Sequence, residues 1–161
     1  MKCYLLRHGQ AVDADAWQGS DFDRPLTAKG KTRVERAAKA LAAWGLDLDV
    51  IVTSPLLRAQ QTAAIVAEGL RFGGRIVEDA RLGGGFGPVV LADVLAVHGA
   101  ANAVMLVGHE PALSRIVGQL VGGGNVEFKP ASLACVELAQ PWSDRGTLNW
   151  LIPAEVFALK S

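Results

Sequence analysis

The chain alternates short apolar runs with amphipathic segments, and this pattern predicts strands separated by helices. Two late runs, Leu133 to Leu138 and Thr147 to Ile152, flank a turn region from Gln140 to Gly146 and predict a hairpin. The earlier runs that predict strands are Lys2 to Leu6, Val50 to Thr53, Arg75 to Val77 and Ala103 to Val107.

Between these strands, apolar residues recur at helical spacing, as in the stripe from Val34 to Ala42. Thr27 is a typical N-cap, and Ser54 is expected to cap the next helix with Pro55 at its first position. The loop from Gln10 to Leu26 is long, and loops of this length are often functional. The four expected helices lie between Thr27 and Gly45, between Ser54 and Gly69, from Pro88 to Val97 and between Pro111 and Gly122.

Strand–helix alternation followed by a hairpin is typical of an α/β fold. We expect a three-layer α/β/α arrangement, with helices on both faces of a mostly parallel sheet that has an antiparallel edge. A chain of 161 residues is long enough to bury a substantial core. We therefore expect a single domain over residues 1–161.

The charge and the composition limit the kinds of binding partner and the cellular compartment that we expect. The formal net charge is zero, which argues against binding nucleic acid or a membrane surface through bulk charge. The first apolar run is cut short by Arg7-His8, so it is no signal peptide, and no run approaches the roughly 20 residues that span a bilayer. Cys3 and Cys135 lie in apolar runs without a CxxC spacing and are expected to be buried free thiols in a cytoplasmic protein.

Three predicted strands end in residues with matching chemistry. The first ends in Arg7-His8-Gly9, the second in Ser54-Pro55 with Arg58 soon after, and the fourth in Gly108-His109-Glu110-Pro111. Parallel strands bring their carboxyl ends to one edge of the sheet, where ligands of α/β proteins bind. Two imidazoles, two guanidiniums and two helix N-termini would then meet in one pocket.

Such a pocket suits a dianionic phosphate or sulfate, because guanidiniums and helix N-termini both donate hydrogen bonds to anions. An imidazole inside it can attack phosphorus and carry the phosphoryl group covalently. Taken singly, His8 or His109 is better explained as a structural histidine, and Arg58 as a solvated helix residue. A zinc site from His8, His109 and Glu110 is a further possibility, which two nearby arginines and the missing HxxxH spacing disfavour.

Residues 7–9, the block Ser54-Pro55-Leu56-Leu57-Arg58-Ala59-Gln60-Gln61-Thr62 and Gly108-His109 resemble, in order and spacing, the signatures of the histidine phosphatase superfamily, also called phosphoglycerate mutase-like. The resemblance covers nearly the whole chain. Arg24-Pro25-Leu26-Thr27, residues 108–111 and Lys129-Pro130-Ala131-Ser132 resemble one branch in particular. That branch holds bacterial phosphohistidine phosphatases, which act on phosphorelay proteins.

The resemblance implies roles for several residues. His8 would be the nucleophile, Arg7 and Arg58 would bind the phosphoryl oxygens, and His109 would bind phosphate and stabilise the transition state. Gln10 and Ser54 are weaker candidates for the pocket rim. The resemblance implies a metal-independent enzyme with no cofactor. Arg24 is expected to anchor the first loop.

One departure from the family pattern bears on the substrate. Many members carry an acid after the third strand, but Arg81 takes that place here, and Glu78 and Asp79 are the nearest acids. The imidazole of phosphohistidine leaves more easily than an alkoxide, so a strong general acid is less needed. Glu110 is an alternative acid.

The leading hypothesis is therefore a phosphatase that hydrolyses phosphohistidine on proteins through a covalent intermediate. About fifty residues separate Arg58 from His109, which leaves no room for a large lid and favours an open pocket. A small-molecule phosphomonoesterase or mutase with the same His8 chemistry is the second hypothesis. A non-catalytic module that binds phosphoproteins is the third.

Overall fold

The computed structural model describes residues 1–139 and 143–158. Six strands form one sheet in the order β3-β2-β4-β1-β5-β6. The first four strands run parallel to one another, β5 pairs antiparallel with β1, and β6 pairs antiparallel with β5. The strands are β1 (Lys2–Arg7), β2 (Val50–Thr53), β3 (Arg75–Glu78), β4 (Ala103–Gly108), β5 (Leu133–Leu138) and β6 (Gly146–Ile152).

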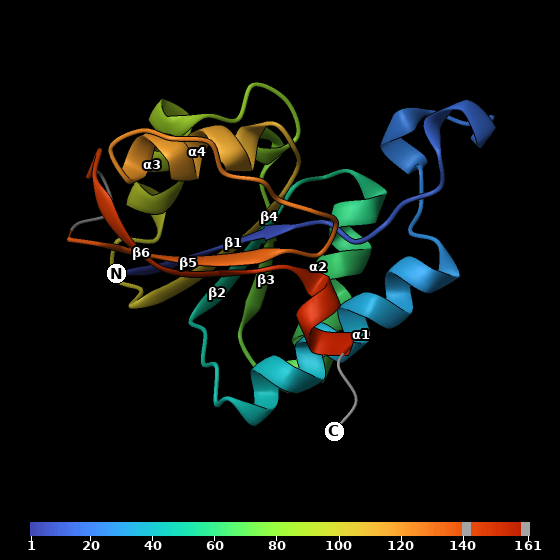
Figure 1. Cartoon of the computed structure of the whole chain (residues 1–161), viewed down its shortest axis with the longest axis horizontal. Coiled ribbons are helices and arrows are strands. Elements are labelled where there is room, and N and C mark those ends of the chain that lie inside the picture. Colours follow the sequence, from blue (N-terminus) through green and yellow to red (C-terminus); the bar gives the residue numbers. More distant parts are fainter. Residues whose placement is uncertain (140–142, 159–161) are drawn as a thin grey trace.

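Helices cover both faces of this sheet (Figure 1), which confirms the expected three-layer α/β/α fold with an antiparallel edge. Helices α1 and α2 pack on one face, and α3 and α4 pack on the other. The helices are α1 (Ala28–Ala43), α2 (Leu57–Leu70), α3 (Pro88–Val97) and α4 (Ala112–Leu120). Within the described residues, none of them is both long and apolar enough to cross a bilayer.

The central strand β1 is buried on both faces, which explains its unbroken apolar run. Cys3 and Leu5 belong to the core beneath α3 and α4, whereas Tyr4 and Leu6 belong to the core beneath α1 and α2. Both cysteines are free and buried, as predicted, and Cys135 lies in the core opposite to that of Cys3. The strand therefore reaches the edge of the sheet at Arg7 and His8 with no freedom to shift its register.

The start of α1 is held against the end of β1. Thr27 caps the helix as predicted, since its hydroxyl oxygen accepts a hydrogen bond from the Gly30 amide at 2.9 Å. Gly30 allows a close approach, because a Cβ placed there would lie 2.1 Å from the Gln10 carbonyl oxygen. The amide of Thr27 also donates to that carbonyl at 2.9 Å. The backbone just after His8 is thus held by the first turn of α1.

The predicted cap of the second helix is wrong. Helix α2 begins at Leu57 with Leu56 in the N-cap position, and no side chain caps it. The hydroxyl of Ser54 accepts only a long hydrogen bond of 3.3 Å from the Leu56 amide. It also lies within hydrogen-bond distance of His109, so this side chain contacts His109 rather than capping the helix.

Two other predictions concern loops. The long segment after β1 contains two single-turn 3-10 helices, Ala14–Ala16 and Asp21–Asp23, and its ends are joined by a bridge between Ala11 and Leu26. The hairpin of β5 and β6 is confirmed. Residues 140–142 of its predicted turn lie outside the described residues.

Candidate active site

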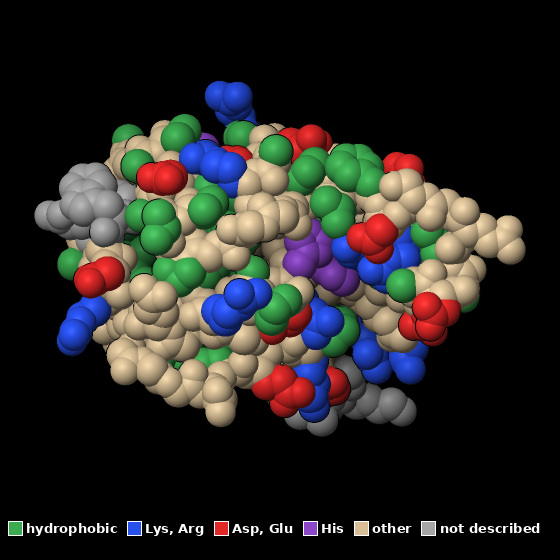
Figure 2. All heavy atoms as spheres, turned by 90° about the horizontal axis from the view of Figure 1, so that it is seen from above, with side chains coloured by type: hydrophobic (Ala, Val, Ile, Leu, Met, Phe, Trp, Pro, Cys, Tyr) green, Lys and Arg blue, Asp and Glu red, His purple; other side chains and the backbone are tan. Residues whose placement is uncertain are grey.

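The three strand ends singled out in the sequence meet at one edge of the sheet. Arg7 of β1 stands beside Gly108 of β4, and Thr53 of β2 stands beside Val107. A pocket of about 640 Å³ opens there. In Figure 2 histidine side chains are visible at this face, with Lys and Arg side chains directly beside them. The residues lining the pocket are Arg7, His8, Gly9, Gln10, Ala11, Asp13, Arg24, Lys29, Arg33, Arg58, His109, Glu110 and Pro130.

His8 is held from three directions. Its amide donates to the Gly108 carbonyl at 3.1 Å, and its carbonyl accepts from the Ala131 amide at 3.1 Å. In the ring, Nδ1 lies 2.7 Å from the Gly9 carbonyl oxygen. A carbonyl only accepts, so Nδ1 carries the proton and donates it there. The lone pair of the neutral ring is therefore on Nε2, which is the nitrogen available for attack.

The pKa of His8 is lowered to about 3, mainly because the ring is buried. The neighbouring charges of His109, Arg58 and Arg7 lower the pKa further, whereas the hydrogen bond to Gly9 raises it. Without an anion in the pocket, the ring is thus neutral at pH 7. A neutral imidazole is the form that can act as a nucleophile.

His109 lies directly beside His8, with the two ring centroids 4.9 Å apart. Its Nε2 is 2.8 Å from the hydroxyl oxygen of Ser54, which is fully buried. When that hydroxyl donates to Nε2, the proton of the neutral ring is on Nδ1. Burial, followed by the charge of Arg58, lowers the pKa of His109 to about 4.

Two guanidiniums complete the pocket. Arg7 donates through Nη1 to the Phe128 carbonyl oxygen at 2.6 Å. Arg58 donates to Asp21 twice, to the carbonyl oxygen at 2.8 Å and to the carboxylate at 3.1 Å. Arg7 is thus anchored through one terminal nitrogen and Arg58 through both, and each guanidinium keeps further N–H groups for a ligand.

Three buried side-chain nitrogens among the described residues have no hydrogen-bond partner: Nε of Arg7, Nε of Arg58 and Nδ1 of His109. Buried polar atoms without partners are rare, and each costs about 1–3 kcal/mol. All three belong to residues that line the pocket around His8. A tetrahedral oxyanion would supply the acceptors that they lack.

The residues predicted less strongly for the pocket rim, and the predicted loop anchor, lie in different places. Gln10 lines the pocket, and its backbone carbonyl binds Thr27. Ser54 does not line the pocket but contacts His109 from behind. Arg24 binds the Val12 carbonyl at 2.6 Å and Asp21 at 2.7 Å, which fits the predicted anchor of the first loop.

The acids after the third strand are engaged elsewhere. Asp79 accepts hydrogen bonds from the guanidinium of Arg81, and Glu78 accepts one from Gln60. Glu110 lines the pocket, but its carboxylate accepts hydrogen bonds from the amide and hydroxyl of Ser114. Among the residues that the structure describes, no three His, Cys, Asp or Glu side chains are grouped as metal ligands.

Sequence reasoning missed several residues of the site. Asp21 holds Arg58 across 37 positions of the chain, and Thr62 accepts a hydrogen bond from the Gly9 amide at 3.0 Å. Lys29 and Arg33 of α1 line the pocket. Their spacing of four residues places them on one face of a helix, which was a usable signal.

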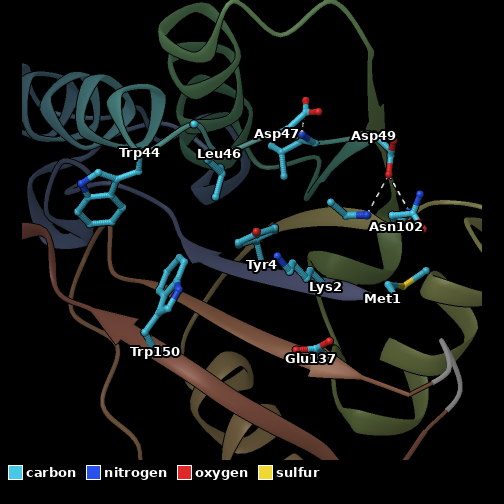
Figure 3. A pocket seen from close by; sticks show the side chains of 13 residues that line it. Met1, Lys2, Tyr4, Trp44, Leu46, Asp47, Asp49, Asn102, Glu137 and Trp150 are labelled. Atoms are coloured by element: carbon cyan, nitrogen blue, oxygen red, sulfur yellow. Dashed lines mark hydrogen bonds between the residues drawn. The ribbon is translucent and has the colours of Figure 1, made fainter.

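A second hollow, of about 620 Å³, lies at the opposite edge of the sheet (Figure 3). Trp44, Trp150 and Tyr4 line it together with three carboxylates. The carboxylate of Asp49 binds the amides of Asn102 and Ala103, as the dashed lines show. With these three carboxylates against the single side-chain cation of Lys2, this aromatic lining is less suited to a phosphate group than the pocket around His8.

Curated proteins resemble this chain in sequence. The chain is 30% identical to the phosphohistidine phosphatase SixA of Escherichia coli over 154 residues, which cover 93% of this chain and 92% of that protein. An uncharacterized protein of Picosynechococcus is 52% identical over 67 residues. That match covers 42% of this chain and 40% of the cyanobacterial protein.

Solved structures match the whole fold. A SixA structure with bound tungstate has a TM-score of 0.86 at 27% identity and covers 97% of this chain and 99% of its own. A structure described as a putative SixA from Agrobacterium tumefaciens has a TM-score of 0.79 at 26% identity and covers 94% and 96%. The sequence model described as the histidine phosphatase superfamily (branch 1) matches residues 3–84. With these matches over a phosphoglycerate mutase-like fold, the chain belongs to the histidine phosphatase superfamily.

Proposed function

We propose that this phosphatase hydrolyses phosphohistidine on proteins, with His8 as the nucleophile that carries the phosphoryl group. The observation that carries the proposal is the set of unpartnered buried nitrogens of Arg7, Arg58 and His109 around the ring of His8. They supply donors for the phosphoryl oxygens in the transition state. The full-length similarity to a phosphohistidine phosphatase supports the same chemistry.

In the first step, Nε2 of His8 attacks phosphorus while the bond from phosphorus to the substrate nitrogen breaks. The electron pair of that bond goes to the leaving imidazole, which takes up a proton from water. Nδ1 of His8 keeps its proton and its hydrogen bond to Gly9 as the ring gains positive character. Arg7 and Arg58 balance the charge of the phosphoryl oxygens.

In the second step, water attacks the phosphoryl group on His8. The bond between phosphorus and Nε2 breaks, the electron pair returns to the ring, and inorganic phosphate leaves. The carboxylate of Asp79 is bound by the guanidinium of Arg81 and so is not available as a general acid. This fits a substrate whose leaving group is an imidazole, because that leaving group needs little help from a carboxylic acid. An alkoxide would need such help.

Three substrates distinguish the hypotheses. A histidine-phosphorylated protein, an aryl phosphate and phosphoglycerate would be incubated side by side with the enzyme, and released phosphate measured. We expect kcat/KM to be highest for the phosphohistidine protein. Comparable efficiency on all three would contradict the proposed specificity. Isomerisation of phosphoglycerate, or phosphate released from it alone, would favour a small-molecule enzyme or a mutase. Binding of the phosphoprotein without turnover would favour a non-catalytic module.

The role of His8 is tested by the substitution His8→Ala. We expect turnover to fall by at least about 10³-fold, because the nucleophile is lost, while the far-ultraviolet circular dichroism spectrum is unchanged. His98→Ala removes an imidazole that does not line the pocket and is the matched control. Acid-labile phosphate should appear on the wild-type chain after rapid quenching and be absent from His8→Ala. Wild-type rates in His8→Ala would contradict the assignment.

A further inference from the structure

Helix α1 carries a stripe of positive side chains that starts at the pocket. Lys29, Arg33 and Arg36 are spaced by four and three residues, so they lie along one face of the helix. Lys29 and Arg33 line the pocket around His8, and all three line a neighbouring hollow beside it. At a rise of about 1.5 Å per residue, the stripe leads about 10 Å away from the pocket.

The charges of this stripe are free to act on a partner. Lys29 and Arg36 are exposed and Arg33 is half-buried. Within the described part of the chain, none of the three takes part in an ion pair. Glu155 is the one carboxylate among the described residues that line the neighbouring hollow, and it is not paired with them.

The rest of α1 does not repeat this arrangement. The buried residues of the helix, such as Val34 and Leu41, face the sheet. Lys31 lies on the flank away from the stripe, and Lys39 lines a different hollow that also contains Glu35 and Glu68. The positive side chains of α1 thus form two groups, a stripe without ion pairs among the described residues that adjoins the pocket, and single positions elsewhere on the helix.

We propose that the stripe of Lys29, Arg33 and Arg36 is the docking surface for the substrate protein, and that it binds acidic side chains about 10 Å from the phosphohistidine. The inference rests on the proposed function. Arg7, Arg58 and His109 already offer unpartnered donors to a phosphate group. The stripe runs from the pocket rim to Arg36, which lies outside the pocket and so beyond the reach of a lone phosphate. A carboxylate-rich surface around the phosphohistidine matches its charge and shape.

The test compares two double charge reversals. Lys29→Glu/Arg36→Glu changes the stripe, and Lys31→Glu/Lys39→Glu makes the same change of charge at two other exposed positions of α1. Each is measured for kcat/KM on a histidine-phosphorylated protein with an acidic surface and on free phosphohistidine. We expect the stripe variant to lose at least about tenfold more on the protein than on the free amino acid, mainly through KM. The control pair should show no such difference.

Two further measurements sharpen the result. Arg36 lies outside the pocket, so Arg36→Glu alone should raise KM for the protein substrate about threefold and leave the kinetics on free phosphohistidine unchanged. Added salt should raise KM of the wild type for the protein substrate more steeply than that of the stripe variant, because exposed charges are screened.

The outcomes separate the two proposals. If the wild type hydrolyses the phosphoprotein but both double variants lose equally, the docking surface is overturned and the proposed function stands. Equal losses of the stripe variant on the protein and on free phosphohistidine would also overturn it, because the stripe would then act on the phosphate. If the wild type releases no phosphate from the phosphoprotein, the proposed function fails, and the inference fails with it.

Discussion

At the scale of single residues, the pocket depends on side chains that use some of their nitrogens to bind the protein and leave the others for a ligand. His8 gives Nδ1 to the Gly9 carbonyl, Arg7 gives Nη1 to the Phe128 carbonyl, and Arg58 gives both terminal nitrogens to Asp21. The opposite atoms are left without partners. Such preorganisation lowers the cost of reorganising the site when charge develops in the reaction.

The buried imidazole makes the stability of the protein sensitive to acid. The pKa of His8 is about 3 in the folded state against an ordinary value of 6.5, so between these values the unfolded chain binds the proton and the folded chain does not. Stability is therefore complete above pH 6.5 and is lost as the pH falls towards 3. At pH 5 the loss from His8 alone is about 2 kcal/mol.

Urea unfolding in a buffer free of phosphate measures this effect. Between pH 7 and pH 5, the free energy of unfolding should fall less steeply in His8→Ala than in the wild type. His98→Ala, which removes a histidine outside the pocket at the end of α3, is measured beside it for comparison. Parallel slopes for His8→Ala and the wild type would show that burial of this ring does not carry the acid sensitivity.

At the scale of elements, the contact between α1 and the segment after β1 positions His8, the proposed nucleophile. In an exposed helix, Gly→Ala stabilises by about 1 kcal/mol. At Gly30 the added Cβ would meet the Gln10 carbonyl oxygen at 2.1 Å, which is a backbone atom and cannot move alone. We expect Gly30→Ala to destabilise the protein by about 1–3 kcal/mol and to lower kcat, because Gln10 is two residues from His8.

Thermal unfolding and steady-state kinetics check this prediction. Gly73→Ala is the control, since a Cβ at Gly73 meets nothing within 4 Å. It should change stability by no more than about 0.5 kcal/mol. An increase in stability for Gly30→Ala would mean that α1 can move away from the Gln10 backbone without cost.

The strand ends could be predicted from the sequence, whereas contacts that depend on tertiary structure could not. The strand of residues 2–6 and the meeting of Arg7, Arg58 and His109 were predictable, because apolar runs and parallel topology place strand ends on one edge. The pairing of Asp21 with Arg58 was not, since it depends on the path of a long loop. Ser54 was misassigned because a hydroxyl can serve either a helix end or a neighbouring imidazole, and only tertiary structure decides which.

At the scale of the whole molecule, the pocket is a cluster of positive groups in a chain without net charge. Filling it with an anion should therefore stabilise the whole fold. A ligand at one hundred times its Kd adds about 2.7 kcal/mol, which corresponds to several degrees in Tm for a chain of this size. We expect phosphate or tungstate to raise Tm, whereas potassium chloride at equal ionic strength should not.

The same measurement on variants locates the anion. Arg58→Ala should abolish the rise in Tm, because one of the two pocket guanidiniums is removed. Arg75→Ala, which removes an exposed guanidinium at the start of β3, should keep it. A rise in Tm that survives in Arg58→Ala would place the stabilising anion elsewhere on the molecule.

The two free thiols, one in each core, have a consequence for how the molecule can be followed in solution. Burial raises the pKa of the Cys3 thiol to about 12, so it carries no thiolate at neutral pH, and burial also raises the pKa of the Cys135 thiol. Alkylation then requires the core around that thiol to open. Cys3 reports on opening of the core beneath α3 and α4, and Cys135 reports on opening of the other core, which also contains Ala154 and Trp150. The rate of alkylation of each thiol therefore measures how often the core around it opens.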